Sequence, residues 1–125
     1  ETYNILSIQY DRYNAPQLVS RLQEHGLTCE SFDQNARRFN APLKTLETLI
    51  YNKEISFSNP ILLWNFQNVV LYVDGNSNIK IVKNKQVESV DGVVALGMAM
   101  GGYIESLYGD EIMGIQGYLD GQKNA

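Results

Sequence analysis

The chain is poor in the residues that cross-link small proteins or bind zinc. It contains one cysteine, Cys29, and one histidine, His25, among 125 residues. A single cysteine excludes an internal disulfide, and a single histidine without a partner at ligand spacing argues against a zinc site. We expect Cys29 to be a buried, unreactive thiol in a reducing, intracellular protein. We expect His25 to lie in the last turn of a helix that Gly26 ends.

Long hydrophobic runs and targeting segments are also missing. No signal peptide, lipidation motif or membrane-spanning stretch is recognisable. A hydrophobic content of 44% and a charged content of 19% are ordinary for one globular domain of this length. The sequence begins at Glu1 without a methionine, and we interpret it as a piece of a longer protein.

Charge is distributed unevenly along the chain. The net charge is -4, which is not typical of a freestanding nucleic-acid binder, because contacts with phosphates supply most non-specific affinity. Residues 34–87 nevertheless carry a net positive charge, whereas the segments before and after them are acidic. A basic middle flanked by carboxylates is compatible with a metal-dependent nuclease, and equally with ordinary solvated charge.

The first third of the chain predicts a strand, a helix and a second strand. Apolar and polar residues alternate from Ile5 to Asp11, and Asn14 with Pro16 predicts the start of a helix. A second alternating run follows over residues 27–32. Two strands joined by a helix form the parallel βαβ unit of α/β folds, with Asp11 at the carboxyl end of its first strand.

The remainder predicts three further helices and a hairpin. Residues 33–42 lack any period and contain Arg37 and Arg38, so we expect a loop there. Asn59 and Pro60 begin another helix, with an apolar side that includes Leu63 and with Trp64 half-buried. The elements expected are a helix over 43–50, a helix from residue 59, a hairpin of strands 69–73 and 79–82, a helix from residue 89 to about 107, and a loosely ordered acidic tail over 109–125.

Two aspartates are candidates for a shared metal site. Asp11 ends the first strand, and Asp91 opens the last helix, which is so apolar that we expect Asp91 to face the interior. Two carboxylates about 4 Å apart repel by about 4 kcal/mol at an effective dielectric of 20, so their juxtaposition requires a cation or a shared proton. The alternative is that each is a helix-end residue, since a first-turn acid gains from the helix dipole.

The same segments resemble the C-terminal nuclease domain of the large terminase subunit of tailed bacteriophages. This subunit belongs to the motor that packages viral DNA. The order and spacing agree over residues 3 to about 104. The matching segments are residues 10–15, residues 42–47 after a loop that contains Gln34, residues 59–64 followed by 68–70, and residues 90–96.

The resemblance implies an α/β fold with an RNase H-like mixed sheet flanked by helices. It implies an endonuclease that cuts concatemeric viral double-stranded DNA with two Mg²⁺ or Mn²⁺ ions and water as the nucleophile. On this match Asp11 and Asp91 are the second and third metal-binding, catalytic acids. The first acid lies on an earlier strand that this chain lacks, so residues 1–108 would be a partial nuclease domain followed by the tail over 109–125. An isolated fragment of this kind would bind metal weakly and cut slowly or not at all.

The resemblance also implies partners and a setting. The resemblance implies an ATPase domain upstream in the same protein. This chain has no glycine-rich phosphate loop, so translocation cannot reside here. The expected location is the cytoplasm of the bacterial host, without membrane contact. Four basic residues are candidate contacts for the DNA backbone: Arg37, Arg38, Lys83 and Lys85.

Two other functions remain open from the sequence. The first is a non-catalytic docking module that binds the portal protein or the small terminase subunit through the acidic tail from Gly109. The second is another RNase H-like enzyme of the resolvase or integrase type, which would need a different upstream sequence.

Overall fold

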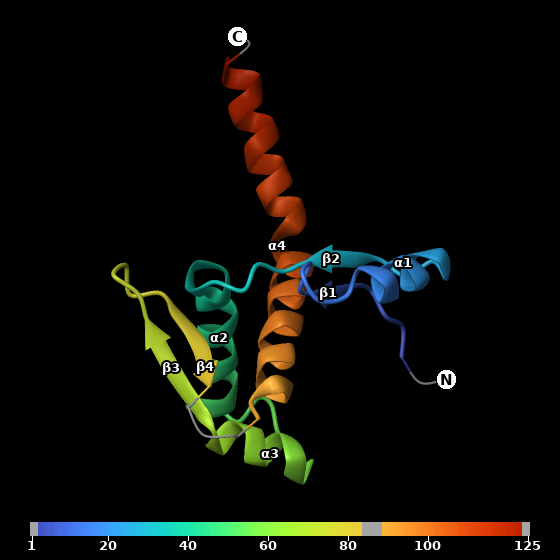
Figure 1. The fold of residues 1–125 in the computed structure, drawn as a ribbon. Coiled ribbons are helices and arrows are strands. Elements are labelled where there is room, and N and C mark those ends of the chain that lie inside the picture. The colour runs from blue at the N-terminus through green and yellow to red at the C-terminus, as the bar shows by residue number, and fades with distance from the viewer. Residues whose placement is uncertain (1–2, 84–88, 124–125) are drawn as a thin grey trace.

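The computed structural model describes residues 3–83 and 89–123, which form helices and short strands of a mixed α/β fold (Figure 1). Within the described residues the strands make two separate two-stranded sheets, β1 with β2 and β3 with β4, and not the single mixed sheet that was predicted. The elements are β1 (Ile8–Tyr10), α1 (Pro16–Glu24), β2 (Cys29–Ser31), α2 (Ala36–Tyr51), α3 (Pro60–Gln67), β3 (Val69–Val73), β4 (Ile79–Lys83) and α4 (Asp91–Lys123).

The predicted βαβ unit is confirmed. β1 and β2 are parallel, with Ile8 opposite Cys29 and Tyr10 opposite Ser31. Gly26, with a φ of 81°, ends the turn after α1, as expected of a glycine in the left-handed region. Cys29 is a free thiol, but it is half-buried where we predicted full burial, because its three-residue strand is covered only in part.

The start of α1 differs from the prediction. Its N-cap residue is Ala15, which makes no side-chain capping bond, and Pro16 occupies the first turn. The side chain of Asn14, predicted to cap the helix, instead donates a hydrogen bond of 2.7 Å to Oδ2 of Asp11. The side chain of Asn14 therefore binds the Asp11 carboxylate and does not cap α1.

The predicted loop over residues 33–42 is wrong, because α2 begins at Ala36. Oδ1 of Asn35 accepts a hydrogen bond of 2.8 Å from the backbone amide of Arg38 and so caps the helix. Pro42 lies inside the helix, where it removes one backbone hydrogen bond, yet its ring is buried. Burial of Phe39 and Pro42 against the rest of the fold offsets the lost hydrogen bond. This burial cannot be recognised from the local sequence pattern.

Helix α3 starts where predicted, and its predicted apolar side is covered only in part, since Leu62 and Phe66 are half-buried but Leu63 is exposed. Oδ1 of Asn59 accepts hydrogen bonds from the backbone amides of Ile61 and Leu62, at 2.9 and 3.1 Å. Leu63 is 43% exposed and Trp64 45% exposed, so Leu63 does not belong to a buried apolar side. The residue of α3 that is buried is polar, Asn65.

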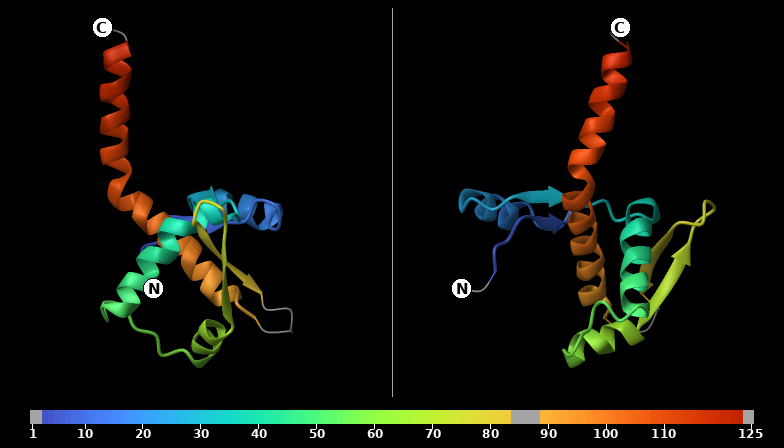
Figure 2. Two further views of the ribbon diagram at one scale, coloured as in Figure 1. Left: turned by 90° about the vertical axis from the view of Figure 1, so that its left-hand side faces the viewer. Right: turned by 180° about the vertical axis from the view of Figure 1, so that it is seen from behind.

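The core lies between α2 and the hairpin of β3 and β4. The antiparallel hairpin is confirmed, with Val73 opposite Ile79, and its strand β4 packs against α2, beside which the hairpin lies in the right view of Figure 2. Its central cluster of buried side chains is formed by Phe32, Phe39, Leu43 and Ile79. The rings of Phe32 and Phe39 are 4.8 Å apart between centroids.

Helix α4 packs closely on its neighbours through glycines. A Cβ atom built on Gly101 would lie 2.6 Å from Cε2 of Phe32, and one on Gly102 would lie 2.8 Å from Nε2 of Gln9. The predicted end near Leu107 is wrong, since the helix continues to Lys123 and extends away from the other elements (Figure 1). A glycine costs a helix about 1 kcal/mol relative to alanine, so several glycines weaken it without ending it. None of the described helices combines the length and hydropathy needed to cross a membrane.

Candidate metal and DNA site

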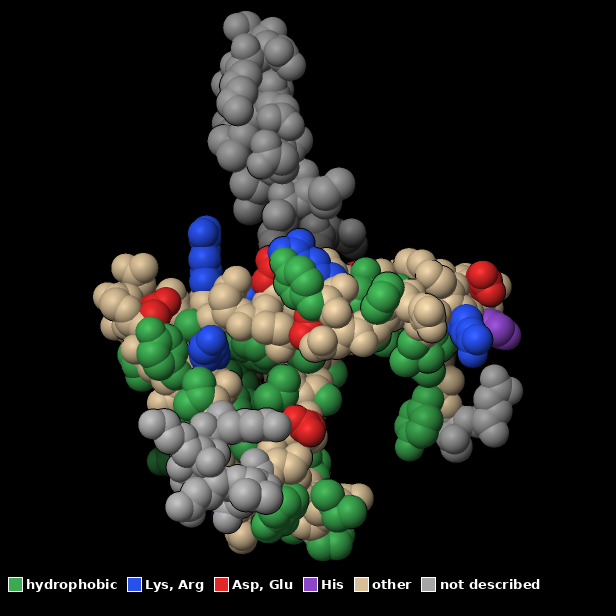
Figure 3. Space-filling model, viewed as in Figure 1, with side chains coloured by type: hydrophobic (Ala, Val, Ile, Leu, Met, Phe, Trp, Pro, Cys, Tyr) green, Lys and Arg blue, Asp and Glu red, His purple; other side chains and the backbone are tan. Residues whose placement is uncertain are grey.

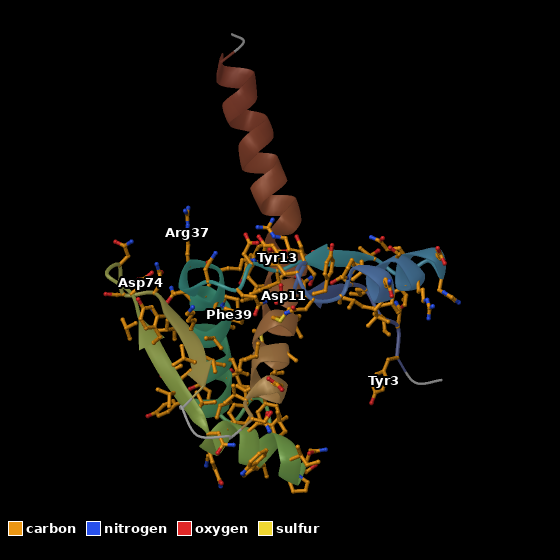
Figure 4. The ribbon with its side chains drawn as sticks, in the orientation of Figure 1. Tyr3, Asp11, Tyr13, Arg37, Phe39 and Asp74 are labelled. Atoms are coloured by element: carbon orange, nitrogen blue, oxygen red, sulfur yellow. The ribbon has the colours of Figure 1, made fainter. Side chains whose placement is uncertain are left out.

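Asp11 follows the last residue of β1, and its carboxylate is held by two local donors. The backbone amide of Tyr13 donates to Oδ1 at 3.1 Å, and Nδ2 of Asn14 donates to Oδ2 at 2.7 Å. Asp11 is half-buried beside α4, whereas the side chain of Tyr13 is 78% exposed (Figure 4). Each carboxylate oxygen has a second lone pair, so these bonds orient Asp11 without using up its capacity as a ligand.

A cleft of about 480 Å³ separates β1 from α4 and has Asp11 at its edge. On the α4 side it is lined by Ala95, Met98 and Ala99. The small alanine side chains leave this space open next to the carboxylate. The sequence placed Asp11 at a strand end, and the structure adds that this strand end faces α4.

Asp91 is the first residue of α4, as predicted, but it is exposed and does not face the interior. The buried residues of the first turns of α4 are Val93 and Gly97, which lie on another side of the helix. Asp91 borders a second cleft, of about 450 Å³, together with Ser89 and residues of α3. The apolar composition of α4 predicted a buried helix, but only one side of its described part is buried, and Asp91 lies on the exposed side.

The two acids lie on the same face of α4 but in neighbouring clefts. Asp91, Ala95, Met98 and Ala99 follow the spacing of one helical stripe, and Asp11 borders this stripe from β1. Ala95 and Ala99 follow Asp91 by about 6 and 12 Å along the helix axis, at a rise of about 1.5 Å per residue. Asp11 and Asp91 line different clefts, which have no lining residue in common.

The carboxylates of this face are the right type of ligand for a hard divalent cation, but there are too few of them to complete a site. Carboxylate oxygens are the ligands that Mg²⁺ and Mn²⁺ prefer. Within the described residues, however, no group of three or more His, Cys, Asp or Glu side chains converges as a metal site would need. A complete site at this position requires at least one further ligand.

The four basic candidates have different positions. Arg38 contacts Oε1 of Glu105 at 2.6 Å and lies 4.3 Å above the Phe32 ring, so it is engaged in joining α2 to α4. Arg37 is exposed and points away from the fold (Figure 4). Lys83 ends β4, and its side chain is not among those described; Lys85 lies outside the described residues.

Charge around the base of the exposed part of α4 is mixed. Figure 3 shows Lys and Arg side chains beside Asp and Glu side chains there, and not a continuous basic surface on the described part of this face. Arg12, which the sequence reasoning did not single out as a site residue, is exposed. Its guanidinium lies 3.6 Å from Oδ1 of Asp33 and 5.0 Å from the centroid of the Tyr13 ring. Its position directly after Asp11 was the available signal.

Two further polar residues were missed by the sequence reasoning. Asn65 and Asn68 are 3% and 7% exposed and lie next to the segment that leads into Asp91. Their signal was the presence of amide side chains three positions apart, one within the largely apolar α3 and one directly after it.

Comparison with known proteins identifies the family. The family described as "Terminase large subunit, endonuclease domain" matches residues 1–106. The large terminase subunit of Enterobacteria phage HK97 is 28% identical over 102 residues, which are 79% of this chain and 20% of that protein. Protein YmfN of Escherichia coli strain K12 is 34% identical over 94 residues, which are 73% of this chain and 21% of that protein.

A solved structure agrees with the sequence comparison. The crystal structure of the HK97 bacteriophage large terminase superposes with a TM-score of 0.70 and 27% identity, over 80% of this chain and 22% of that one. The chain thus spans about a fifth of the length of the relatives it matches. Since the family match covers most of the sequence, the chain belongs to the endonuclease-domain family of terminase large subunits.

Proposed function

We propose that this chain is part of a metal-dependent DNA endonuclease, within a large terminase subunit that cuts concatemeric viral DNA during genome packaging. Family membership supports the class of protein. The observation that carries the proposal is that Asp11 and Asp91 border one face of α4, at its first turn and at the adjoining strand end. The resolvase or integrase alternative gains no support, because the family match is to terminases.

In this proposal the two acids are ligands of two Mg²⁺ or Mn²⁺ ions. Bound metal would supply an activated water and stabilise the leaving oxygen of the phosphodiester. Asp11 contributes a carboxylate whose orientation is fixed by the amide of Tyr13 and the side chain of Asn14. Asp91 contributes an exposed carboxylate at a helix N-terminus, where a bound cation would be accessible to a DNA phosphate.

The proposed nuclease fold extends beyond this chain. Within the described residues β1 pairs only with β2, and the apolar side chains before β1 are exposed, Ile5 by 55% and Leu6 by 72%. An exposed edge and exposed apolar residues are what a partial RNase H-like sheet leaves when its first strands are absent. The third acid would come from one of those strands, and an ATPase domain would precede them.

DNA is the substrate in this proposal, and Arg37 is its best-placed backbone contact among the described residues. Arg37 is exposed in the first turn of α2, which follows the carboxyl end of β2. Arg38 would contribute less, because its guanidinium is already paired with Glu105. The proposed setting is the cytoplasm of the bacterial host, with the portal protein and the small terminase subunit as further partners.

The test replaces each acid in the native protein that carries this chain. Asp11→Asn and Asp91→Asn keep the size of the side chain and remove its charge, so each should abolish Mn²⁺-dependent nicking of plasmid DNA. Asp74→Asn is the matched control, since Asp74 lies in the hairpin turn and should leave nicking unchanged. Nicking by both acid variants at the wild-type rate would refute the proposal. If portal binding were then lost on truncation at Gly109, the docking function would be favoured instead.

A further inference from the structure

Two buried asparagines, Asn65 of α3 and Asn68 at the C-cap of that helix, hold the backbone on both sides of Asp91. Asparagine is usually exposed, because burying an amide costs free energy unless its groups are hydrogen-bonded. Asn65 and Asn68 are nevertheless only 3% and 7% exposed. We therefore expect their side-chain amides to make specific hydrogen bonds within the protein.

Those bonds reach the entrance of α4. Nδ2 of Asn68 donates to the carbonyl oxygen of Ser89 at 3.1 Å, and the backbone amide of Gly92 donates to Oδ1 of Asn65 at 2.9 Å. The remaining donor of Asn65, Nδ2, is satisfied within α3 by the carbonyl oxygen of Ile61 at 3.0 Å. The two contacts fall two residues before and one residue after Asp91.

The residue after Asp91 is matched to this contact. A Cβ atom on Gly92 would lie 3.2 Å from Oδ1 of Asn65 and 3.2 Å from Cδ1 of Leu62, closer than side chains usually approach. Glycine lets the first turn of α4 lie directly against the amide of Asn65. This is an independent indication that α3 and the segment around Asp91 fit one another.

The contact also changes what Asp91 can do. A first-turn acid commonly compensates the free amides of a helix N-terminus. Here Asn65 accepts from the amide of Gly92, and Ser89 Oγ accepts from the amide of Asp91 at 3.4 Å. In the described part of the chain no group donates a hydrogen bond to the Asp91 carboxylate. Its oxygens are left available for a ligand.

We infer that Asn65 and Asn68 are positioning residues, which fix the carboxylate of Asp91 for divalent-metal binding. The inference rests on the proposed function, since it assumes that Asp91 binds metal. Metal ligands have to be held within about 0.5 Å of their productive positions, and loss of such a supporting group typically weakens metal affinity by about 10- to 100-fold.

The experiment measures binding of Mn²⁺ alone to the native protein, by calorimetry, next to thermal unfolding. Asn65→Ala should raise the Kd for Mn²⁺ by about 10- to 100-fold, and Asn68→Ala should raise it in the same direction. The matched control is Asn40→Ala. Oδ1 of Asn40 also accepts from the backbone of another element, the amide of Ile79 at 3.2 Å, but this contact is in the hairpin. The control should lose stability and keep its Mn²⁺ affinity.

Each outcome decides the inference. A folded Asn65→Ala protein with wild-type Mn²⁺ affinity would overturn it, as would an Asn40→Ala protein whose affinity falls equally. If Asn65→Ala does not fold, Asn68→Ala and Gly92→Ala decide in its place, since Gly92→Ala only displaces the contact by a few tenths of an ångström. Asp91→Asn separates the two proposals. If Asp91→Asn binds Mn²⁺ with wild-type affinity, the proposed function fails. If Asp91→Asn loses Mn²⁺ affinity but Asn65→Ala and Asn68→Ala keep it, only the positioning role fails.

Discussion

The arm, formed by β1, α1 and β2, and the body, formed by α2, α3, the hairpin and the first half of α4, differ in how they bury their side chains. In the arm Val19 is buried, whereas Leu18, Leu6 and Tyr13 are each more than half exposed. In the body α2 alone buries five residues along one face. A two-stranded sheet with one helix is marginally stable on its own, so the arm depends on its attachment to the body.

The proposed site lies across this attachment. Asp11 belongs to the arm and Asp91 to the body. The arm is held through Phe32, which follows β2 and is 1% exposed, and through Gln9, which lies against Gly102 of α4. The relative position of the two acids is therefore set by packing between the regions, and substitutions there should reach the site without touching either carboxylate.

The largest predicted effect comes from removing the side chain that joins the two regions. Phe32→Ala should lower the free energy of unfolding by about 3 to 5 kcal/mol, the usual cost of deleting a fully buried phenylalanine. Leu18→Ala in the arm should change it by less than about 0.5 kcal/mol, because Leu18 is exposed. Urea denaturation followed by circular dichroism measures both. Similar losses from the two variants would show that the arm has a core of its own.

The sequence predicted the locally encoded parts of both regions. Alternating residues and Gly26 predicted the arm, and Asn59 with Pro60 predicted the start of α3. The first turns of α2 were missed because Pro42 and the two arginines imitate a loop, while the burial that stabilises this helix comes from Phe32 and α4. The far end of α4 was missed because glycines suggest a break that the backbone does not make.

The site was predicted in part for the same reason. Local order along the chain placed Asp11 at a strand end and Asp91 at a helix start. The exposure of Asp91 depends on which side of α4 the other elements cover, and that is a tertiary property. Asn65 and Asn68 were missed because their role depends on hydrogen bonds to the backbone of residues 89 and 92, which the sequence does not reveal.

Two adjacent glycines of α4 allow the two contacts that hold the arm to the body to be loosened separately. Gly101→Ala places a Cβ 2.6 Å from the buried ring of Phe32 and should cost about 1 to 3 kcal/mol by overpacking. Gly102→Ala meets only the flexible tip of Gln9, at 2.8 Å, so it should cost less stability. Gly102→Ala should instead displace β1 and weaken Mn²⁺ binding more than its stability loss suggests. Thermal unfolding and Mn²⁺ titration of both variants test this, and the reverse order of stability would contradict it.

Replacing the two arginines of α2 one at a time should distinguish a residue that stabilises the fold from one that contacts DNA. Arg38→Ala removes the ion pair with Glu105 and the contact with Phe32 and should cost about 1 kcal/mol, since each such interaction near the surface contributes at most about that much. Arg37→Ala should leave stability unchanged. It should lower the slope of log binding constant against log salt for DNA by about 1, as expected for one phosphate contact. If replacing both arginines leaves that slope unchanged, their assignment to DNA is wrong.

The smallest predicted effect lies in the hairpin of the body, far from either acid. The hydrogen bond from the backbone amide of Asn78 lowers the pKa of Asp74 below its usual value of 3.8, and the amide of Asn76 acts in the same direction against the opposing effect of burial. A carboxyl whose pKa is lower in the folded state stabilises the fold above pH 3.8 and loses this contribution as the pH falls through the folded value. The stability difference between wild type and Asp74→Ala should therefore be constant near neutrality and shrink below pH 3.8. A difference that grows on acidification would show that the neutral carboxyl, and not the carboxylate, holds the turn.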